Sequence, residues 1–130
     1  MNLCIDTCAY VALKKGNTSV ISLLEAARTL LVPTIVLGEL YAGFYIGSRT
    51  SGNITELHEF LDQPDINIKG PDNDIAERYG IIIKELRQKG SPIPTNDIWI
   101  AATALETGAR LLTLDKHFEQ IPGLILIYPL

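Results

Sequence analysis

Four acidic residues in this 130-residue chain have the types and positions from which a catalytic metal site can be built. They are Asp6, Glu39, Asp97 and Asp115. Oxygen ligands without histidine or cysteine suit the hard cations Mg²⁺ and Mn²⁺. Such ions polarise a phosphate and lower the pKa of a bound water, which then becomes a nucleophile. The four acids therefore predict metal-assisted hydrolysis, provided that the fold brings them together.

Three of these acids also have a purely local explanation. Asp6 can cap the helical turn that follows it, and Asp97 can interact favourably with the dipole of its own helix. Asp115 can begin an Asx-turn. Glu39 has no such local explanation, because its helical face carries apolar neighbours and a carboxylate there is costly to bury without a partner.

The acids are more informative as a group than one by one. Two carboxylates that lie about 5 Å apart repel each other by about 3 kcal/mol at an effective dielectric of about 20. A cluster of four is therefore stable only if it holds protons or cations. Three polar residues beside the acids could support it by hydrogen-bonding a carboxylate, a water or a phosphate, namely Thr7, Asn96 and Thr113.

The cysteines and histidines do not suggest a competing site. Cys4 and Cys8 have neither the spacing of a zinc site nor that of a CxxC redox motif, so we interpret them as two small buried side chains. His58 and His117 are far apart in the sequence and each lacks a nearby ligand partner. We interpret both as surface or packing residues and expect no cofactor other than the metal.

Apolar periodicity and turn residues predict strands that alternate with helices. The expected strands are Asn2–Asp6, Leu31–Val32, Ile66–Ile68, Arg110–Leu114 and Leu124–Ile127. The expected helices are a short segment up to Leu13, Ser19–Leu30, Ile35–Ile46 capped by Thr34, Ile54–Leu61, Asn73–Lys89, and one capped by Thr95 or Asn96 that ends at Thr107. This order predicts an α/β protein with a mostly parallel sheet and helices on both faces. Ligands of such sheets bind outside the carboxyl ends of the strands, which is where Asp6 and Asp115 are expected.

Length and composition predict one domain over residues 1–130, with 47% hydrophobic and 20% charged residues. The apolar run Leu30–Leu37 is broken by Pro33 and Thr34, so it is far shorter than the about 20 residues of a membrane span. The first residues lack the basic start and long apolar stretch of a secretory signal, which predicts a cytoplasmic protein.

The net charge of −4 is unusual for a protein that binds nucleic acid. A bound metal would neutralise acids that are concentrated in its site, and basic residues can still line the rim. Any single one of these residues is more often a solvated surface charge. The candidates are Lys14, Lys15, Arg49, Lys84, Arg87, Lys89 and Lys116.

The acids occur within four short motifs, namely Ile5-Asp6-Thr7, Leu37-Gly38-Glu39-Leu40, Asn96-Asp97-Ile98-Trp99-Ile100-Ala101-Ala102 and Thr113-Leu114-Asp115-Lys116-His117-Phe118. In this order and at these separations, the motifs resemble those of the PIN-domain nucleases, and specifically the VapC-type toxins of toxin–antitoxin pairs. The resemblance implies a PIN-like three-layer α/β/α sandwich. It also implies that the four acids are both catalytic and metal-binding, with Thr113 as the family's small hydroxyl residue and Thr7 as the polar residue after the first acid.

The resemblance further implies a Mg²⁺- or Mn²⁺-dependent endoribonuclease that acts as a toxin. A metal-activated water, oriented by Asp97 in our interpretation, would attack the phosphorus and hydrolyse the RNA phosphodiester bond. The expected partners are RNA, a second copy of the chain in a homodimer, and a small cognate antitoxin that blocks the site. Three alternatives stay open: a catalytically weak PIN module that binds RNA or a partner, a housekeeping RNA-processing nuclease, and a phosphatase.

Overall fold

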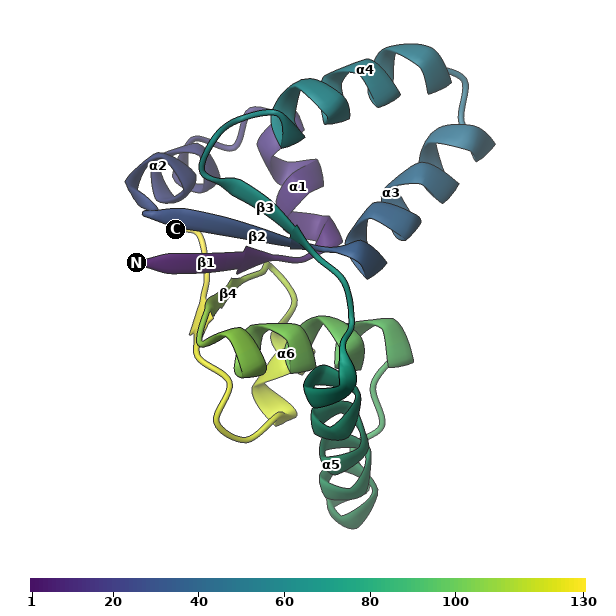
Figure 1. The fold of residues 1–130 in the computed structure, drawn as a ribbon, viewed down its shortest axis with the longest axis vertical. Coiled ribbons are helices and arrows are strands. Elements are labelled where there is room, and N and C mark those ends of the chain that lie inside the picture. Colours follow the sequence, from purple (N-terminus) through teal and green to yellow (C-terminus); the bar gives the residue numbers. More distant parts are fainter.

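The computed structural model describes residues 1–130, and a five-stranded parallel sheet runs through its centre (Figure 1). The strands are β1 (Asn2–Ile5), β2 (Thr29–Pro33), β3 (Ile66–Lys69), β4 (Arg110–Leu112) and β5 (Leu126–Ile127). Their order across the sheet is β3-β2-β1-β4-β5, and every neighbouring pair is parallel. The strand before Asp6 is therefore central, and it pairs directly with the strand before Asp115.

Helices connect the strands and cover both faces of the sheet. They are α1 (Thr7–Lys14), α2 (Thr18–Ala26), α3 (Thr34–Ile46), α4 (Thr50–Leu61), α5 (Asn73–Lys89), α6 (Thr95–Thr107) and the 3₁₀-helix η1 (Lys116–Gln120). In Figure 1, α1, α2 and α4 lie on one side of the sheet, and α5 and α6 lie on the other. The predicted arrangement of a parallel sheet between two helical layers is confirmed. None of the helices combines the length and the apolar character that crossing a bilayer requires.

The strands are apolar because the helices cover them on both sides. Leu3, Cys4 and Ile5 of β1 are all fully buried, so this strand has no solvent-facing residue after its first position. Leu111 and Leu112 of β4 are fully buried as well. Continuous apolar runs of this kind are typical of central parallel strands, and they fix where each strand ends and the polar residues begin.

The α5 boundaries agree with the prediction, because the sequence carries both a start and a stop signal there. The Asp72 side chain accepts a hydrogen bond from the Ile75 backbone N–H at 2.9 Å, which caps the first turn. Gly90 ends the helix with φ 67°, and Gly108 ends α6 in the same way with φ 69°. These left-handed positions favour glycine, which has no Cβ.

The prediction for the segment after α2 was wrong. The helix ends at Ala26 and does not continue to Leu30, and β2 already begins at Thr29. Leu30 and Val32 are buried in β2, which pairs with β1 on one side and β3 on the other. Pairing in the centre of the sheet therefore overrides a helical pattern in the local sequence.

Several predicted caps and boundaries were also wrong. Pro33 and Pro94, both in extended conformation, occupy the N-cap positions of α3 and α6, and neither helix has a side-chain cap. Thr34 and Thr95 are instead the first helical residues. Helix α4 begins four residues earlier than expected, at Thr50. The last two strands are shorter than predicted, because β4 and β5 pair only through Leu111–Leu126 and Leu112–Ile127.

Candidate active site

The candidate site lies at the carboxyl ends of β1 and β4. Ile5 pairs with Leu112 in the sheet, so the residues that follow these two strands emerge side by side. The Asp6 backbone N–H donates to the Leu112 carbonyl at 3.4 Å and extends this pairing by one residue. Asp6 is buried, with 3% of its surface exposed, and Thr113 is fully buried beside it.

Both oxygens of the Asp6 carboxylate accept hydrogen bonds from the protein. Oδ1 accepts from the Ala9 backbone N–H at 2.8 Å, which caps α1, and Oδ2 accepts from the Thr113 hydroxyl. Burial raises the pKa of Asp6, the two hydrogen bonds lower it, and the charges of Asp97 and Asp115 raise it again. The net direction is upward, so this carboxylate lies in a poorly solvated and already negative environment.

Glu39 reaches the site from the middle of α3. It is half-buried, and its Oε1 accepts a hydrogen bond from the Thr7 hydroxyl at 2.7 Å. Thr7 begins α1 directly after Asp6, so this bond joins two helices across 32 residues of sequence. This hydrogen bond gives the half-buried Glu39 carboxylate a partner, which the local sequence did not reveal.

His117 joins the remaining two acids. Its Nε2 lies 2.6 Å from Asp97 Oδ2, and its Nδ1 lies 2.8 Å from Asp115 Oδ1. The same Asp115 oxygen accepts the His117 backbone N–H at 3.1 Å, which is the predicted Asx-type turn at the start of η1. The Asp115 backbone N–H donates to the Thr113 hydroxyl oxygen at 3.0 Å. A continuous polar network therefore runs from Asp97 through His117, Asp115 and Thr113 to Asp6.

The interpretation of His117 as an isolated surface or packing residue was wrong. The sequence does carry a signal, because Asp115 precedes it by two residues, but the contact with Asp97 spans 20 residues and depends on the fold. The same interpretation is confirmed for His58, an exposed residue whose Nε2 pairs with the Tyr41 hydroxyl at 3.1 Å.

The two cysteines differ from each other. Both are free thiols, and Cys4 is buried in β1 as expected, which raises its pKa. Cys8 is exposed on α1, so the prediction that it is buried was wrong. Partial desolvation raises the pKa of Cys8, and the charge of Asp6 raises it further. Cys8 therefore borders the acidic cluster as a neutral thiol.

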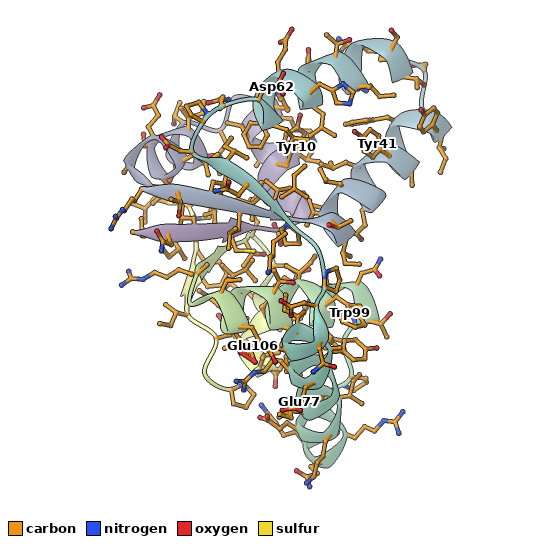
Figure 2. All side chains as sticks on the ribbon, in the orientation of Figure 1. Tyr10, Tyr41, Asp62, Glu77, Trp99 and Glu106 are labelled. Carbon is orange, nitrogen blue, oxygen red and sulfur yellow. The ribbon has the colours of Figure 1, made fainter.

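Helix α6, which carries Asp97, packs against α5, and Figure 2 shows Trp99 and Glu106 of α6 beside that helix. Trp99, two residues further along α6, stacks on Tyr79 of α5 with ring centroids 4.1 Å apart and an interplanar angle of 19°. Arg78 Nε lies 3.6 Å from Glu106 Oε1 at the other end of the same interface. These contacts fix α6, including its first turn, relative to α5. Asn96 is exposed in that turn, and its side chain takes no part in the network.

All four acids share one electrostatic neighbourhood. Burial raises the pKa of Asp97, contact with His117 lowers it, and the charges of Glu39 and Asp115 raise it. The charges of Asp97 and Asp115 in turn raise the pKa of Asp6, so these interactions connect all four predicted acids. No lysine or arginine forms an ion pair with any of them. The excess of negative charge is of the kind that a divalent cation neutralises.

The donor chemistry fits Mg²⁺ or Mn²⁺, since the quartet offers only carboxylate oxygens. The side chains do not, however, enclose an ion: nowhere are three histidine, cysteine, aspartate or glutamate groups arranged to hold one. Each carboxylate is instead engaged by a neighbouring side chain: Thr113 and Thr7 each engage one carboxylate, and His117 engages two.

A hollow of about 560 Å³ adjoins this cluster. It is lined by Thr7, Cys8, Val11, Ala12, Lys15, Gly16, Asn17 and Leu114. Thr7 and Leu114 are sequence neighbours of Asp6 and Asp115, so the hollow opens next to the acids. Lys15 is the one cationic residue in its lining.

Fold and site together define an α/β domain with an acidic cluster at the carboxyl ends of its central strands, and comparison with known proteins specifies the class. Residues 3–124 match the model of the PIN-domain family. Ribonuclease VapC2 of Rickettsia felis is 33% identical over an alignment of 131 positions including gaps, which covers 94% of this chain and 93% of that protein. Ribonuclease VapC1 of Haemophilus influenzae strain R2866 is 31% identical over 125 residues, with 92% of each covered.

Solved structures agree with these matches. The crystal structure of VapBC2 from Rickettsia felis, bound to a DNA fragment from their promoter, has a TM-score of 0.89 at 31% identity and covers 99% of both chains. VapBC-1 from nontypeable Haemophilus influenzae has a TM-score of 0.88 at 26% identity, with 98% of both chains covered. The chain therefore belongs to the PIN-domain family, as a VapC-type member.

Proposed function

We propose that this protein is a metal-dependent endoribonuclease that acts as the toxin of a toxin–antitoxin pair. The observation that carries the proposal is the buried Asp6 at the end of the central strand, linked through Thr113, Asp115 and His117 to Asp97. The similarity to two proteins named as VapC ribonucleases supplies the reaction class. RNA is accordingly the proposed substrate.

The proposed resident metal is Mg²⁺ or Mn²⁺, held by Asp6, Glu39, Asp97 and Asp115. When bound, the ion supplies charge stabilisation at the phosphate and makes a water more acidic. The chain's own groups hold the geometry: Thr113 orients Asp6, and Thr7 orients Glu39. In this proposal Asp97 also orients the attacking water, while its Oδ1, which His117 does not contact, stays available to the ion.

The hollow beside the site is the proposed entry of the RNA backbone. Lys15 lines it, so one cation lies close to the acids despite the net charge of −4. A phosphate held there would lie between a positive side chain and the catalytic cluster. This placement favours Lys15 over the other basic residues of the predicted rim.

The proposed partners follow from the same relatives. The solved structures are described as VapBC complexes, and one of them is bound to promoter DNA. We propose that this chain forms a homodimer and binds a small antitoxin that blocks its acidic site. We also propose that residues 1–130 form one nuclease domain, since a single cluster of 26 buried residues serves as its core. The proposed compartment is the cytoplasm, where such an RNA substrate is made.

The test is cleavage of a structured RNA by purified protein with Mn²⁺ and with EDTA. Glu39→Gln keeps the shape of the side chain but removes its charge, and Glu25→Gln is the matched change at an exposed acid of α2. We expect EDTA and Glu39→Gln to abolish cleavage, and Glu25→Gln to leave it unchanged. Metal-independent cleavage, or full activity of Glu39→Gln, would contradict the assignment.

One observation favours the alternative of a catalytically weak PIN module, since no three of the acids are arranged around a common point. A Mn²⁺ titration by calorimetry distinguishes the two. We expect saturable binding that Asp6→Asn weakens. A wild-type protein that binds RNA but no Mn²⁺ would favour the weak module.

A further inference from the structure

The His117 imidazole lies between two acids that come from separate parts of the fold. Asp97 is on α6, and Asp115 is in the loop that leads from β4 into η1. The ring is partly enclosed, with 30% of the side chain exposed. Each ring nitrogen lies within hydrogen-bond distance of one carboxylate, at 2.6 Å for Asp97 and 2.8 Å for Asp115. In its cationic form the ring donates to both of them.

The pattern of engaged and free oxygens is specific. His117 contacts Asp97 only through Oδ2 and Asp115 only through Oδ1. The second oxygen of each carboxylate accepts no hydrogen bond from the protein. The imidazole therefore fixes both side chains while one oxygen of each stays available to another ligand.

The backbone of His117 and the next residue, Phe118, hold the imidazole ring in place. The His117 N–H donates to Asp115 Oδ1, and the adjacent Phe118 is buried in the core. The rings of His117 and Phe118 lie with centroids 4.9 Å apart. His117 is therefore anchored beside the core and spans the site between Asp97 and Asp115 without belonging to the predicted quartet.

We propose that His117 is a positioning residue, which holds Asp97 and Asp115 at a fixed separation and presents their free oxygens to the divalent ion. This role rests on the proposed metal-dependent function. Without the ring, the two carboxylates repel each other, and each gains freedom to rotate towards solvent. Groups that orient metal ligands in this way typically change metal affinity by about 10- to 100-fold when removed.

The first experiment measures Mn²⁺ affinity by calorimetry in His117→Ala, with His58→Ala as the matched control. The control removes the other of the two histidines, which is exposed and contacts only Tyr41. We expect His117→Ala to weaken binding by about 10- to 100-fold and His58→Ala to leave it unchanged. Equal or tighter binding by His117→Ala would overturn the proposal. No Mn²⁺ binding by the wild-type protein would instead contradict the proposed function.

Two conservative variants separate the two contacts. The His117→Asn amide can replace Nδ1 and reach Asp115, and the His117→Gln amide can replace Nε2 and reach Asp97. We expect each to retain part of the affinity that His117→Ala loses. If both amides bind Mn²⁺ as weakly as alanine, while all variants melt at the same temperature, positioning through these hydrogen bonds is wrong.

A second measurement needs no metal. In the His58→Ala background His117 is the only histidine, so every imidazole signal in a ¹⁵N-correlated spectrum belongs to it. We expect a hydrogen-bonded ring N–H that exchanges slowly with water, and we expect Asp97→Ala to remove or shift it. A ring spectrum that Asp97→Ala leaves unchanged would show that the bridge does not form.

Discussion

Acidic side chains gather at both edges of the sheet, but only at one edge do they form a connected cluster. At the amino ends of β2 and β3, a groove of about 850 Å³ contains four acids in its lining. They are Glu25, Glu56, Glu59 and Asp65. Three of these are exposed and Glu56 is half-buried, and none of the four side chains forms a hydrogen bond or ion pair with another residue. At the carboxyl ends, by contrast, Asp6 is buried and every acid has a protein partner.

The topology explains this difference. The acids of the groove come from α2, α4 and the loop before β3, and no shared side-chain partner connects them. Asp6 and Asp115 follow strands that pair directly, and α3 and α6 bring Glu39 and Asp97 to the same edge. Threonine hydroxyls and one imidazole then connect the side chains. The number of acids does not define the site; burial and shared partners do.

The largest expected effect is a loss of catalysis when an acid at the carboxyl ends of the strands is changed. Asp6→Asn keeps the shape of the side chain and one acceptor oxygen, but it removes the charge that the proposed metal requires. We expect RNA cleavage to fall by about two to three orders of magnitude, a typical loss for one electrostatic catalytic group. The double change Glu25→Gln and Glu59→Gln in the groove is expected to leave the rate unchanged. Comparable losses in the two variants would remove the distinction between the edges.

A smaller loss is expected when a carboxylate loses the group that orients it. Thr113→Val removes the hydroxyl that donates to Asp6 and accepts from the Asp115 N–H, so cleavage should fall by about 10-fold or more. Thr103→Val is the matched control, since Thr103 is also buried but bonds only the Trp99 carbonyl of its own helix.

Thr113→Val is expected to lose about 1–3 kcal/mol of stability, because it leaves buried polar groups without their partner. Thr103→Val is expected to lose less, because the Trp99 carbonyl keeps its backbone hydrogen bond within α6. Denaturant unfolding measures that loss, and initial cleavage rates measure the catalytic effect. If Thr103→Val impairs cleavage as much as Thr113→Val, the effect comes from stability and not from the site.

RNA affinity should show whether the substrate approaches the edge of the sheet at which the acidic cluster lies. Lys15→Ala in the Asp6→Asn background is expected to weaken RNA binding several-fold. It is also expected to reduce the slope of log affinity against log salt concentration by about 0.7, the value for one phosphate contact on a single strand. Fluorescence anisotropy over a range of salt concentrations measures both. Lys84→Ala on the exposed side of α5 is the control. An unchanged slope for Lys15→Ala would exclude the hollow as the RNA path.

The smallest expected difference between the two edges of the sheet is in how their acids make stability depend on pH. In the metal-free protein the pKa values of Asp6 and Asp97 are raised above their usual value of about 3.9, so the folded state binds more protons than the unfolded state just above that pH. The free energy of unfolding therefore decreases as the pH rises from about 4 through the raised pKa values.

Thermal melts in EDTA over this pH range test the direction of this effect. We expect Asp6→Asn to flatten the decline and to melt at a higher temperature than the wild type at neutral pH. The Glu25→Gln variant should keep the wild-type slope. A wild-type protein that becomes more stable over this range would show that burial and repulsion do not dominate at Asp6.

Much of the fold could be predicted from the sequence, because its signals are local. Apolar runs that end in polar residues located the five strands along the chain, and Asp72 with Gly90 defined α5 at both ends. The start of β2 could not be predicted, since Thr29 and Leu30 continue a helical pattern and become a strand only by pairing with β1 and β3. Non-local pairing decides such segments.

The same division holds at the site. The sequence by itself determined which acids to consider. The rule that ligands bind at the carboxyl ends of parallel strands selects Asp6 and Asp115, and the motifs that resemble those of the PIN-domain nucleases add Glu39 and Asp97. Only the tertiary structure decided how they are held: Thr7 to Glu39, Thr113 to Asp6, and His117 between Asp97 and Asp115. The physical reason is distance along the chain. These contacts join residues up to 107 positions apart, and no local pattern encodes which side chains meet when the sheet forms.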